Sequence, residues 1–475
     1  MRAQDVIPNP WMILPFGVLL AAIATGPFLF PQWWAKHYPK VAISLGALTL
    51  GYYLFGLGAV TRVLHVGHEY VSFIALIGSL FVVSGGIHIS VKGEATPGGN
   101  VIFLLVGAVL ANFLGTTGAA MLLIRPWIRM NKYRITSHHI VFFIFIVANV
   151  GGCLTPIGDP PLFLGYLKGI PFWWVAEHCW QIWAIGVAYL LLVFYVVDTI
   201  NYRRAPRALR RELKDEGEHW RFEGGWNVIF LAAILGAVFI EEPPFLRESV
   251  MAAAAVGSWY TTRKSVHDAN QFNFHPIQEV AILFVGIFAT MLPALDWLQV
   301  NAGKMAAPTP AFFYWGSGIL SSVLDNAPTY LSFLSASFGL FVDPHIVDQV
   351  QQLVHARFGG LEGVVMSPEV ENTVQALRKY HAARLAAGKV GTEEIEVAFL
   401  LGNLRFNQFI VAISIGAVFF GANTYIGNGP NFMVKAIADQ QKVHTPGFFG
   451  YILKYAVPCL LPLLALIWLL FFRHS

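Results

Sequence analysis

Runs of apolar residues, each close to 20 residues long, alternate with short polar segments along almost the whole chain. A helix of about 20 apolar residues can cross the hydrocarbon core of a bilayer, so these runs predict membrane-spanning helices. We interpret the first run as a spanning helix rather than a signal peptide, because it is long and no small-residue cleavage site follows it. The clearest runs are residues 11–30, 39–60, 70–91, 175–197, 277–298 and 449–472.

Two of the later apolar segments are interrupted by nearly the same sequence. Residues 155–161 read Thr-Pro-Ile-Gly-Asp-Pro-Pro, and residues 424–430 read Thr-Tyr-Ile-Gly-Asn-Gly-Pro. Glycine and proline at this density prevent a regular helix. One such segment could be a proline kink between packed helices, but a matched pair in the two halves of a membrane protein points to a transporter binding site.

A second pair of segments extends the match between the halves. Residues 111–118 (Ala-Asn-Phe-Leu-Gly-Thr-Thr-Gly) align with residues 321–328 (Ser-Ser-Val-Leu-Asp-Asn-Ala-Pro). Basic residues are frequent in 125–134 and in the linker 198–225, and cytoplasmic loops carry such an excess. Both loops can be cytoplasmic only if residues 101–124 and 311–340 form re-entrant hairpins, the first entering from the cytoplasm and the second from outside. The sequence thus predicts an all-α polytopic membrane protein with an inverted-topology repeat, two re-entrant hairpins and two broken helices.

The polar stretch 342–404 has no counterpart in the first half, and we interpret it as an extramembrane insertion. The other boundaries follow from the pairing of the segments. We expect scaffold helices in 1–100, the first hairpin and broken helix in 101–172, a scaffold helix and cytoplasmic linker in 173–225, scaffold helices in 226–309, the second hairpin in 310–341, the second broken helix in 405–440, and a last scaffold helix in 441–475.

Composition excludes several other classes of protein. Only 12% of the residues are charged, against about 25% in soluble proteins. The net charge of +4 is not gathered on a basic face, so we expect no nucleic-acid partner. The three cysteines lie in or beside apolar segments and indicate no disulfide framework. Neither His-Glu-x-x-His nor Gly-x-Ser-x-Gly occurs, so we do not expect an enzyme, and the repeat argues for alternating access rather than a channel.

The interrupted segments carry the groups that could bind a cation. Freed backbone carbonyls and the oxygens of Thr and Asn side chains suit a hard cation such as Na⁺. Asp159 lies inside the first interruption and Asp325 at the tip of the second hairpin. A carboxylate at membrane depth is costly, and it can hold either H⁺ or Na⁺ but not both. The alternative for each aspartate is a helix cap.

Glu69 and Glu279 each open an apolar segment. They are candidates for accessory proton or ion groups, and the alternative is an interfacial acid favoured by the helix dipole. His65 and His68 precede the first of these segments without a complete metal-binding pattern, so we expect them, like the pair 138–139, to be interfacial histidines.

The interrupted segments resemble the signatures of the ion transporter superfamily. Residues 151–161 are similar to its first unwound helix, residues 421–431 to its second, and 111–117 and 324–329 to its hairpin tips. The chain looks most like D-type bacterial sodium/proton antiporters and a related citrate-transporter-like family. The resemblance implies an elevator-type secondary transporter with two pseudo-symmetric sites for ions or substrate. It implies that one site is lined by Asn112, Thr116, Thr117, Thr155 and Asp159, and the other by Asp325, Asn326, Thr329, Asn423, Thr424 and Asn428.

One departure from the family pattern affects the substrate. Carboxylate-transporting members carry Ser-Asn-Thr at both hairpin tips, whereas this chain has Ala-Asn-Phe at 111–113 and Leu-Asp-Asn at 324–326. An aspartate there would repel a carboxylate, which favours Na⁺/H⁺ antiport. Na⁺- or H⁺-coupled citrate or carboxylate transport is the alternative. We expect a homodimer in the bacterial inner membrane, with Na⁺ as the transported or coupling ion and no cofactor.

Overall fold

The computed structural model describes residues 7–90, 96–204, 221–240, 242–304, 308–355 and 367–473. Within them nearly all regular structure is helical, and seven helices, or up to eight if a bent pair counts as one span, are long and apolar enough to cross a membrane. This confirms the predicted all-α polytopic membrane fold. Four basic residues of the predicted cytoplasmic linker lie outside the described residues: Arg207, Arg210, Arg211 and Lys214.

The described residues of the first half contain seven α-helices and one short strand. They are α1 (Leu14–Leu29), α2 (Pro31–Gly51), α3 (Val60–Gly85), β1 (His88–Ser90), α4 (Pro97–Met130), α5 (Ser137–Ile146), α6 (Pro160–Leu167) and α7 (Trp174–Arg204).

The second half begins with β2, which pairs antiparallel with β1. Its elements are β2 (Arg221–Glu223), α9 (Asn227–Ala237), α10 (Leu246–Thr261), α11 (Lys264–Ala269), α12 (His275–Asn301), α13 (Pro310–Val323), α14 (Asn326–Phe341), α15 (Pro344–His355), α16 (Pro368–Tyr380), α17 (Ala382–Ala387), α18 (Thr392–Leu401), α19 (Leu404–Phe420), α20 (Gly429–Gln440), α21 (Phe448–Tyr451) and α22 (Leu461–Ile467), with a π-helical stretch, Ile452–Leu460, between the last two.

The chain turns back on itself within α4. Gly115 has φ of +71° and breaks the helix into two arms, because this region of backbone conformation favours glycine. The far ends of the arms meet, since the Asn100 Nδ2 donates a hydrogen bond to the Asn131 Oδ1 at 2.9 Å. These arms form the first helical hairpin.

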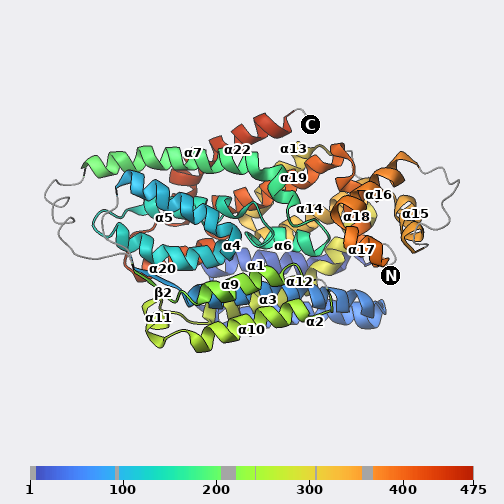
Figure 1. Cartoon of the computed structure of the whole chain (residues 1–475), viewed down its shortest axis with the longest axis horizontal. Coiled ribbons are helices and arrows are strands. Elements are labelled where there is room, and N and C mark those ends of the chain that lie inside the picture. The colour runs from blue at the N-terminus through green and yellow to red at the C-terminus, as the bar shows by residue number, and fades with distance from the viewer. Residues whose placement is uncertain are drawn as a thin grey trace.

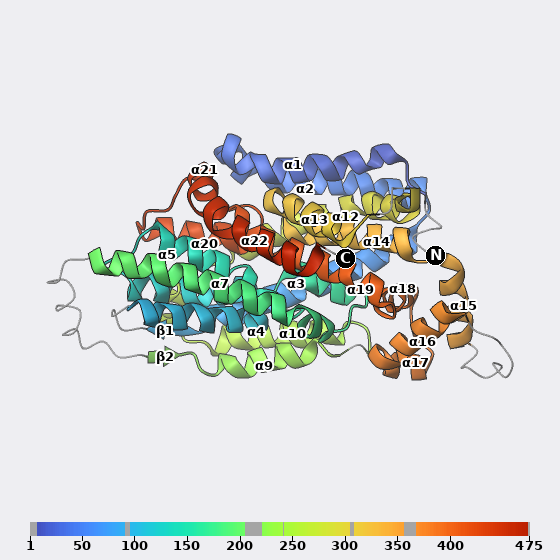
Figure 2. The same ribbon diagram turned by 90° about the horizontal axis from the view of Figure 1, so that it is seen from above.

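Helices α13 and α14 form the second hairpin. The chain is extended at Leu324 and Asp325 between them, and the rings of Phe313 and Phe341 meet near its open end, with centroids 6.5 Å apart. Both hairpins start with a threonine N-cap followed by proline, a combination that favours helix initiation. The open end of the first lies beside the end of α7 and that of the second towards α15, at opposite ends of the molecule (Figures 1 and 2). This supports the predicted inverted orientation.

The broken helices lie in the middle of the molecule. In α5 every residue after Ser137 is buried, and α19 is buried along most of its length. Between α5 and α6 the chain forms only turns and a single 3₁₀ turn, Val150–Gly152, and a 3₁₀ turn, Gly421–Asn423, follows α19. The irregular backbone is therefore enclosed by protein, which is where such backbone is tolerated at membrane depth.

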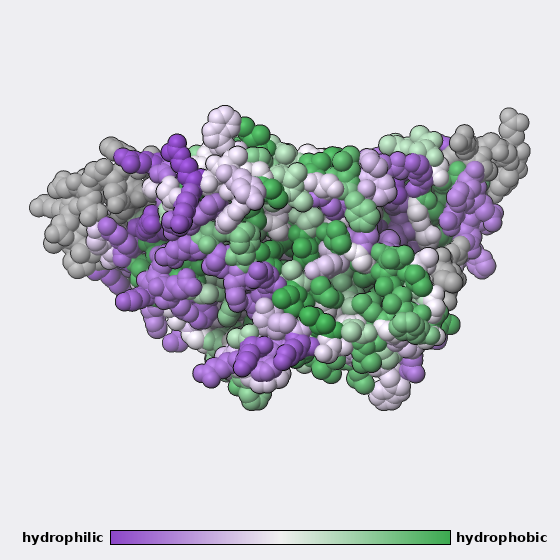
Figure 3. All heavy atoms as spheres, turned by 90° about the horizontal axis from the view of Figure 1, so that it is seen from below, coloured by the Kyte–Doolittle hydropathy of each residue, from purple (hydrophilic) through white to green (hydrophobic). Residues whose placement is uncertain are grey.

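The insertion 342–404 folds into α15 to α18, which gather at one end of the molecule (Figure 2). Hydrophobic residues cover a broad area of the face in Figure 3, and hydrophilic residues gather towards both ends. This distribution suits a protein with an apolar belt between two wetted ends.

Candidate functional site

Asp159 lies where the two hairpins and the two broken helices meet. The Thr116 Oγ1 and the Asn428 Nδ2 donate hydrogen bonds to its Oδ1 at 2.8 and 3.0 Å. The Asn326 Nδ2 donates to its Oδ2 at 2.6 Å. Thr116 follows the break in the first hairpin, Asn326 begins the second arm of the other hairpin, and Asn428 precedes α20. Two donors therefore come from the half that does not contain Asp159.

The carboxylate of Asp159 is fully buried, and among the described residues no cationic side chain forms an ion pair with it. Although Asp159 occupies the N-cap position of α6, its side chain makes no capping bond. The helix-cap explanation is therefore wrong for its side chain. Three neutral donors satisfy the carboxylate but leave its charge uncompensated, a state that favours binding of a proton or a small cation.

The remaining side chains of the first signature hold the unwound backbone. Asn112 accepts a hydrogen bond from the Leu154 N and donates to the Gly151 carbonyl. The Thr155 Oγ1 donates to the Asn112 carbonyl at 2.6 Å and accepts from the Gly158 N at 3.1 Å.

The second signature repeats these contacts at equivalent positions. The Thr424 Oγ1 donates to the Ser322 carbonyl at 2.6 Å and accepts from the Gly427 N at 3.1 Å. The Asn423 Nδ2 donates to the Ser322 Oγ. The two signatures are therefore related by the same hydrogen-bond pattern as well as by similar amino-acid sequences.

A pair of asparagines, of which the sequence analysis missed Asn149, joins the two broken helices. The Asn149 Nδ2 donates to the Asn431 Oδ1 at 2.6 Å, and the Asn431 Nδ2 donates to the carbonyls of Gly421 and Thr424. Both asparagines are fully buried. Asn149 lies two residues before Gly151, the first glycine of the interrupted segment, and this position was the only signal in the sequence that could have identified it.

Asp325 lies at the second hairpin tip but does not bond to Asp159. It is half-buried, and its Oδ1 accepts a capping hydrogen bond from the Ala327 N at 3.0 Å. The Thr329 Oγ1 donates to the Asp325 carbonyl. Thr117 lines a cavity of about 20 Å³ beside Gly158. The residues that we assigned to two separate sites are thus divided differently: three of them bond to Asp159, and most others support the backbone.

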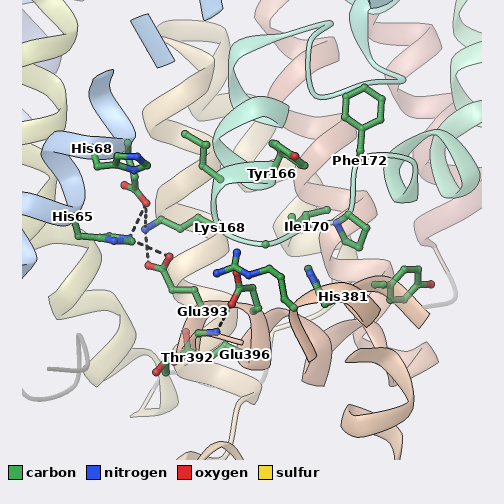
Figure 4. Close-up of a pocket in the computed structure, with 18 of the residues that line it drawn as sticks. His65, His68, Tyr166, Lys168, Ile170, Phe172, His381, Thr392, Glu393 and Glu396 are labelled. Atoms are coloured by element: carbon green, nitrogen blue, oxygen red, sulfur yellow. Dashed lines mark hydrogen bonds and ion pairs between the residues drawn. The ribbon is translucent and has the colours of Figure 1, made fainter. Parts of the chain in front are cut away.

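A second group of charges lies in a cavity of about 940 Å³ between α3, the turn after α6 and the insertion (Figure 4). The Lys168 Nζ lies 2.6 Å from the Glu69 Oε1 and 2.7 Å from the Glu393 Oε1. The His65 Nε2 lies 3.2 Å from a carboxylate oxygen of each glutamate. Burial raises the pKa of Glu393, but Lys168 and His65 outweigh it and hold that pKa well below its usual range.

Glu69 and Glu279, the two candidates for accessory proton or ion groups, lie in different environments. Glu69 is buried and ion-paired, whereas Glu279 is half-buried at the start of α12. Sequence analysis missed Lys168 and Glu393. Lys168, the one charged residue between Asp159 and Glu177, could have been noticed as an ionisable group beside an apolar run. Glu393 carries no such signal.

The expectation that His138 and His139 are interfacial is wrong, because both are buried. Their Nε2 atoms lie 3.3 and 3.1 Å from the Asp198 Oδ1 on α7. The Arg134 Nη2 and the Asn100 Nδ2 each donate to the Asp198 Oδ2 at 2.9 Å. This network ties the open end of the first hairpin to α5 and α7.

Asp198→Asn should lower the stability of the protein by about 2 kcal/mol, because hydrogen bonds to a buried charge are worth about 1.5–3 kcal/mol. The expected result is a lower thermal unfolding midpoint in detergent. Asp343→Asn, at an exposed position, is the control and should leave the midpoint unchanged. Equal midpoints for the two variants would show that the network contributes little.

Comparison with protein families shows which family the chain belongs to. A family model described as "Putative citrate transport" matches residues 6–472, nearly the whole chain. No curated protein matches the chain.

Proposed function

Because the chain belongs to this citrate transport family, and is therefore a multi-pass secondary transporter, we propose that it exchanges Na⁺ for H⁺ by alternating access. The observation that carries the proposal is the fully buried carboxylate of Asp159, bonded by neutral donors from both halves of the chain.

The exchange follows from the single charge at this position. In one state Asp159 holds a proton, and in the other its carboxylate binds Na⁺, so one ion must leave before the other binds. The Asn326 Oδ1 is buried and has no hydrogen-bond partner among the described residues. This oxygen, together with that of Thr116, could complete the oxygen ligands that Na⁺ requires.

The space beside the tip of the first hairpin also favours a small ion. The cavity lined by Thr116, Thr117 and Gly158 has a volume of about 20 Å³. A single water needs at least about 10–15 Å³, so this cavity accommodates an ion or a water and not a tricarboxylate. An uncompensated aspartate would in addition repel a carboxylate.

Cation-coupled citrate transport is the second candidate, and the family description favours it. In that case Asp159 would hold the coupling cation, and citrate would bind in a state with a wider cavity. Both candidates use the same moving elements, which we propose to be the hairpins and broken helices carried against the scaffold helices of a homodimer in the bacterial inner membrane.

Reconstituted liposomes with a preset pH gradient distinguish the candidates. We expect added Na⁺ to dissipate the gradient, since protons must leave as Na⁺ enters, and labelled citrate not to accumulate. K⁺ and choline in place of Na⁺, and protein-free liposomes, are the controls. The opposite result would favour the second candidate and contradict antiport. In that case citrate would accumulate when a Na⁺ or proton gradient is applied, and Na⁺ would cause no proton movement when citrate is absent.

A further inference from the structure

We propose that the insertion 342–404 is a latch: through Glu393 it holds the turn after α6 against α3, and transport requires this contact to open. The contact joins three parts of the chain that are far apart in sequence. Lys168 follows α6, Glu69 belongs to α3, and Glu393 lies in the first turn of α18.

Lys168 is the centre of the latch. Its side chain is buried, and its ammonium lies within 2.7 Å of a carboxylate oxygen of both Glu69 and Glu393. Figure 4 shows the side chains of Lys168, Glu393 and His65 converging. Removing one carboxylate from a buried lysine leaves its charge less compensated, so the two contacts depend on each other.

Backbone packing holds the insertion in the same place. A Cβ on Gly169 would lie 3.1 Å from the Glu394 Cγ, so the turn after α6 and the start of α18 are in close contact. Further along α18, the Glu396 Oε1 accepts a hydrogen bond from the Gln299 Nε2 on α12 at 2.9 Å. The insertion therefore bridges the turn after α6 and a helix that we assign to the scaffold.

The latch connects directly to the proposed ion site. Helix α6 has only eight residues, with Asp159 at its N-cap and Lys168 at its C-cap. A helix rises 1.5 Å per residue, so about 13.5 Å along a single short helix separates the two positions. A displacement of Asp159 against the scaffold in the transport cycle must therefore move Lys168 relative to Glu69, which belongs to scaffold helix α3.

A metal ion fits this cluster less well than the latch does. His65, Glu69 and Glu393 bring potential ligand atoms within 4.8 Å of one another. However, the ammonium of Lys168 already bonds to both glutamates. A bound cation would have to displace it, so the cluster already contains its own counter-charge.

Hydrogen exchange of Glu393→Gln in detergent tests the latch without requiring transport. We expect the amides of residues 166–172 to exchange about fivefold faster, the factor that a loss of about 1 kcal/mol produces. In reconstituted liposomes, transport should become faster. The matched control is Glu371→Gln on α16, where an exposed glutamate accepts a hydrogen bond from Gln375 in the same helix.

Ionic strength gives a second measurement on the unaltered protein. Exchange at residues 166–172 should accelerate between about 0.05 and 0.5 M salt, because screening weakens the partly exposed Glu393 pair. Glu393→Gln should reduce this dependence. Equal exchange in Glu393→Gln and Glu371→Gln would overturn the latch whether or not the protein exchanges Na⁺. Faster hydrogen exchange in Glu393→Gln without faster transport, in protein shown to be active, would overturn the latch as well.

Discussion

Asp159→Asn is expected to reduce cation-dependent proton movement to the level of protein-free liposomes. The substitution removes the buried charge while preserving the shape of the side chain. Asn326 can rotate its amide so that its Oδ1, which now has no partner, accepts a hydrogen bond from the new amide. The protein should therefore fold, and the loss should affect transport rather than stability. Fluorescence of a pH-sensitive dye inside liposomes measures the flux.

Asp439→Asn is the matched control for this experiment. Asp439 lies on α20, is exposed, and interacts with Lys435 and Thr445 rather than with the site. Its substitution should leave the flux unchanged. Asp325→Asn provides a further comparison, because asparagine is as good an N-cap as aspartate and the helix should be retained. Robust Na⁺/H⁺ exchange by Asp159→Asn would remove Asp159 from the mechanism.

Gly427→Ala is expected to prevent the second broken helix from forming and to lower stability by at least about 3 kcal/mol, at the upper end of the overpacking range. A Cβ at this position would lie 2.6 Å from the carbonyl oxygens of both Gly421 and Ser321. Both clashing atoms belong to the backbone, so rotation of a side chain cannot relieve the clash. The yield of monodisperse protein and its thermal unfolding midpoint measure the effect.

Gly429→Ala is the control from the same signature. No atom lies within 4 Å of a Cβ at this position, which is exposed at the start of α20. This variant should fold as the unaltered protein does. Equal yields and midpoints for the two variants would show that the backbone at residue 427 relaxes easily. The close approach of Gly427 to Gly421 and Ser321 would then not be needed to hold the site together.

The sequence was sufficient to locate the broken segments and hairpin tips, because glycine, proline and hydropathy act locally. It was not sufficient to divide the site residues by role. Thr155 and Thr424 carry the same letter and hold the same backbone turn, whereas Thr116 bonds to Asp159. That difference depends on which backbone passes nearby, and local sequence does not contain this information.

The tertiary structure was also needed for the charged groups outside the signatures. The Lys168 contacts with Glu69 and Glu393 join residues far apart in the chain, as does the approach of Asp198 to the buried pair His138 and His139. A histidine pair beside a basic loop looks interfacial when its partner, about 60 residues away, is not visible.

The amino-acid sequence by itself determined that this protein is a helical membrane transporter with two interrupted segments. The reason is that apolar length and helix-breaking residues decide where a chain can cross a bilayer and where it must unwind. Only the tertiary structure decided that the two interruptions meet at one carboxylate and that the insertion contacts the far end of the same short helix. Those contacts depend on how the two halves pack, and packing brings together donors and charges that the linear order keeps apart.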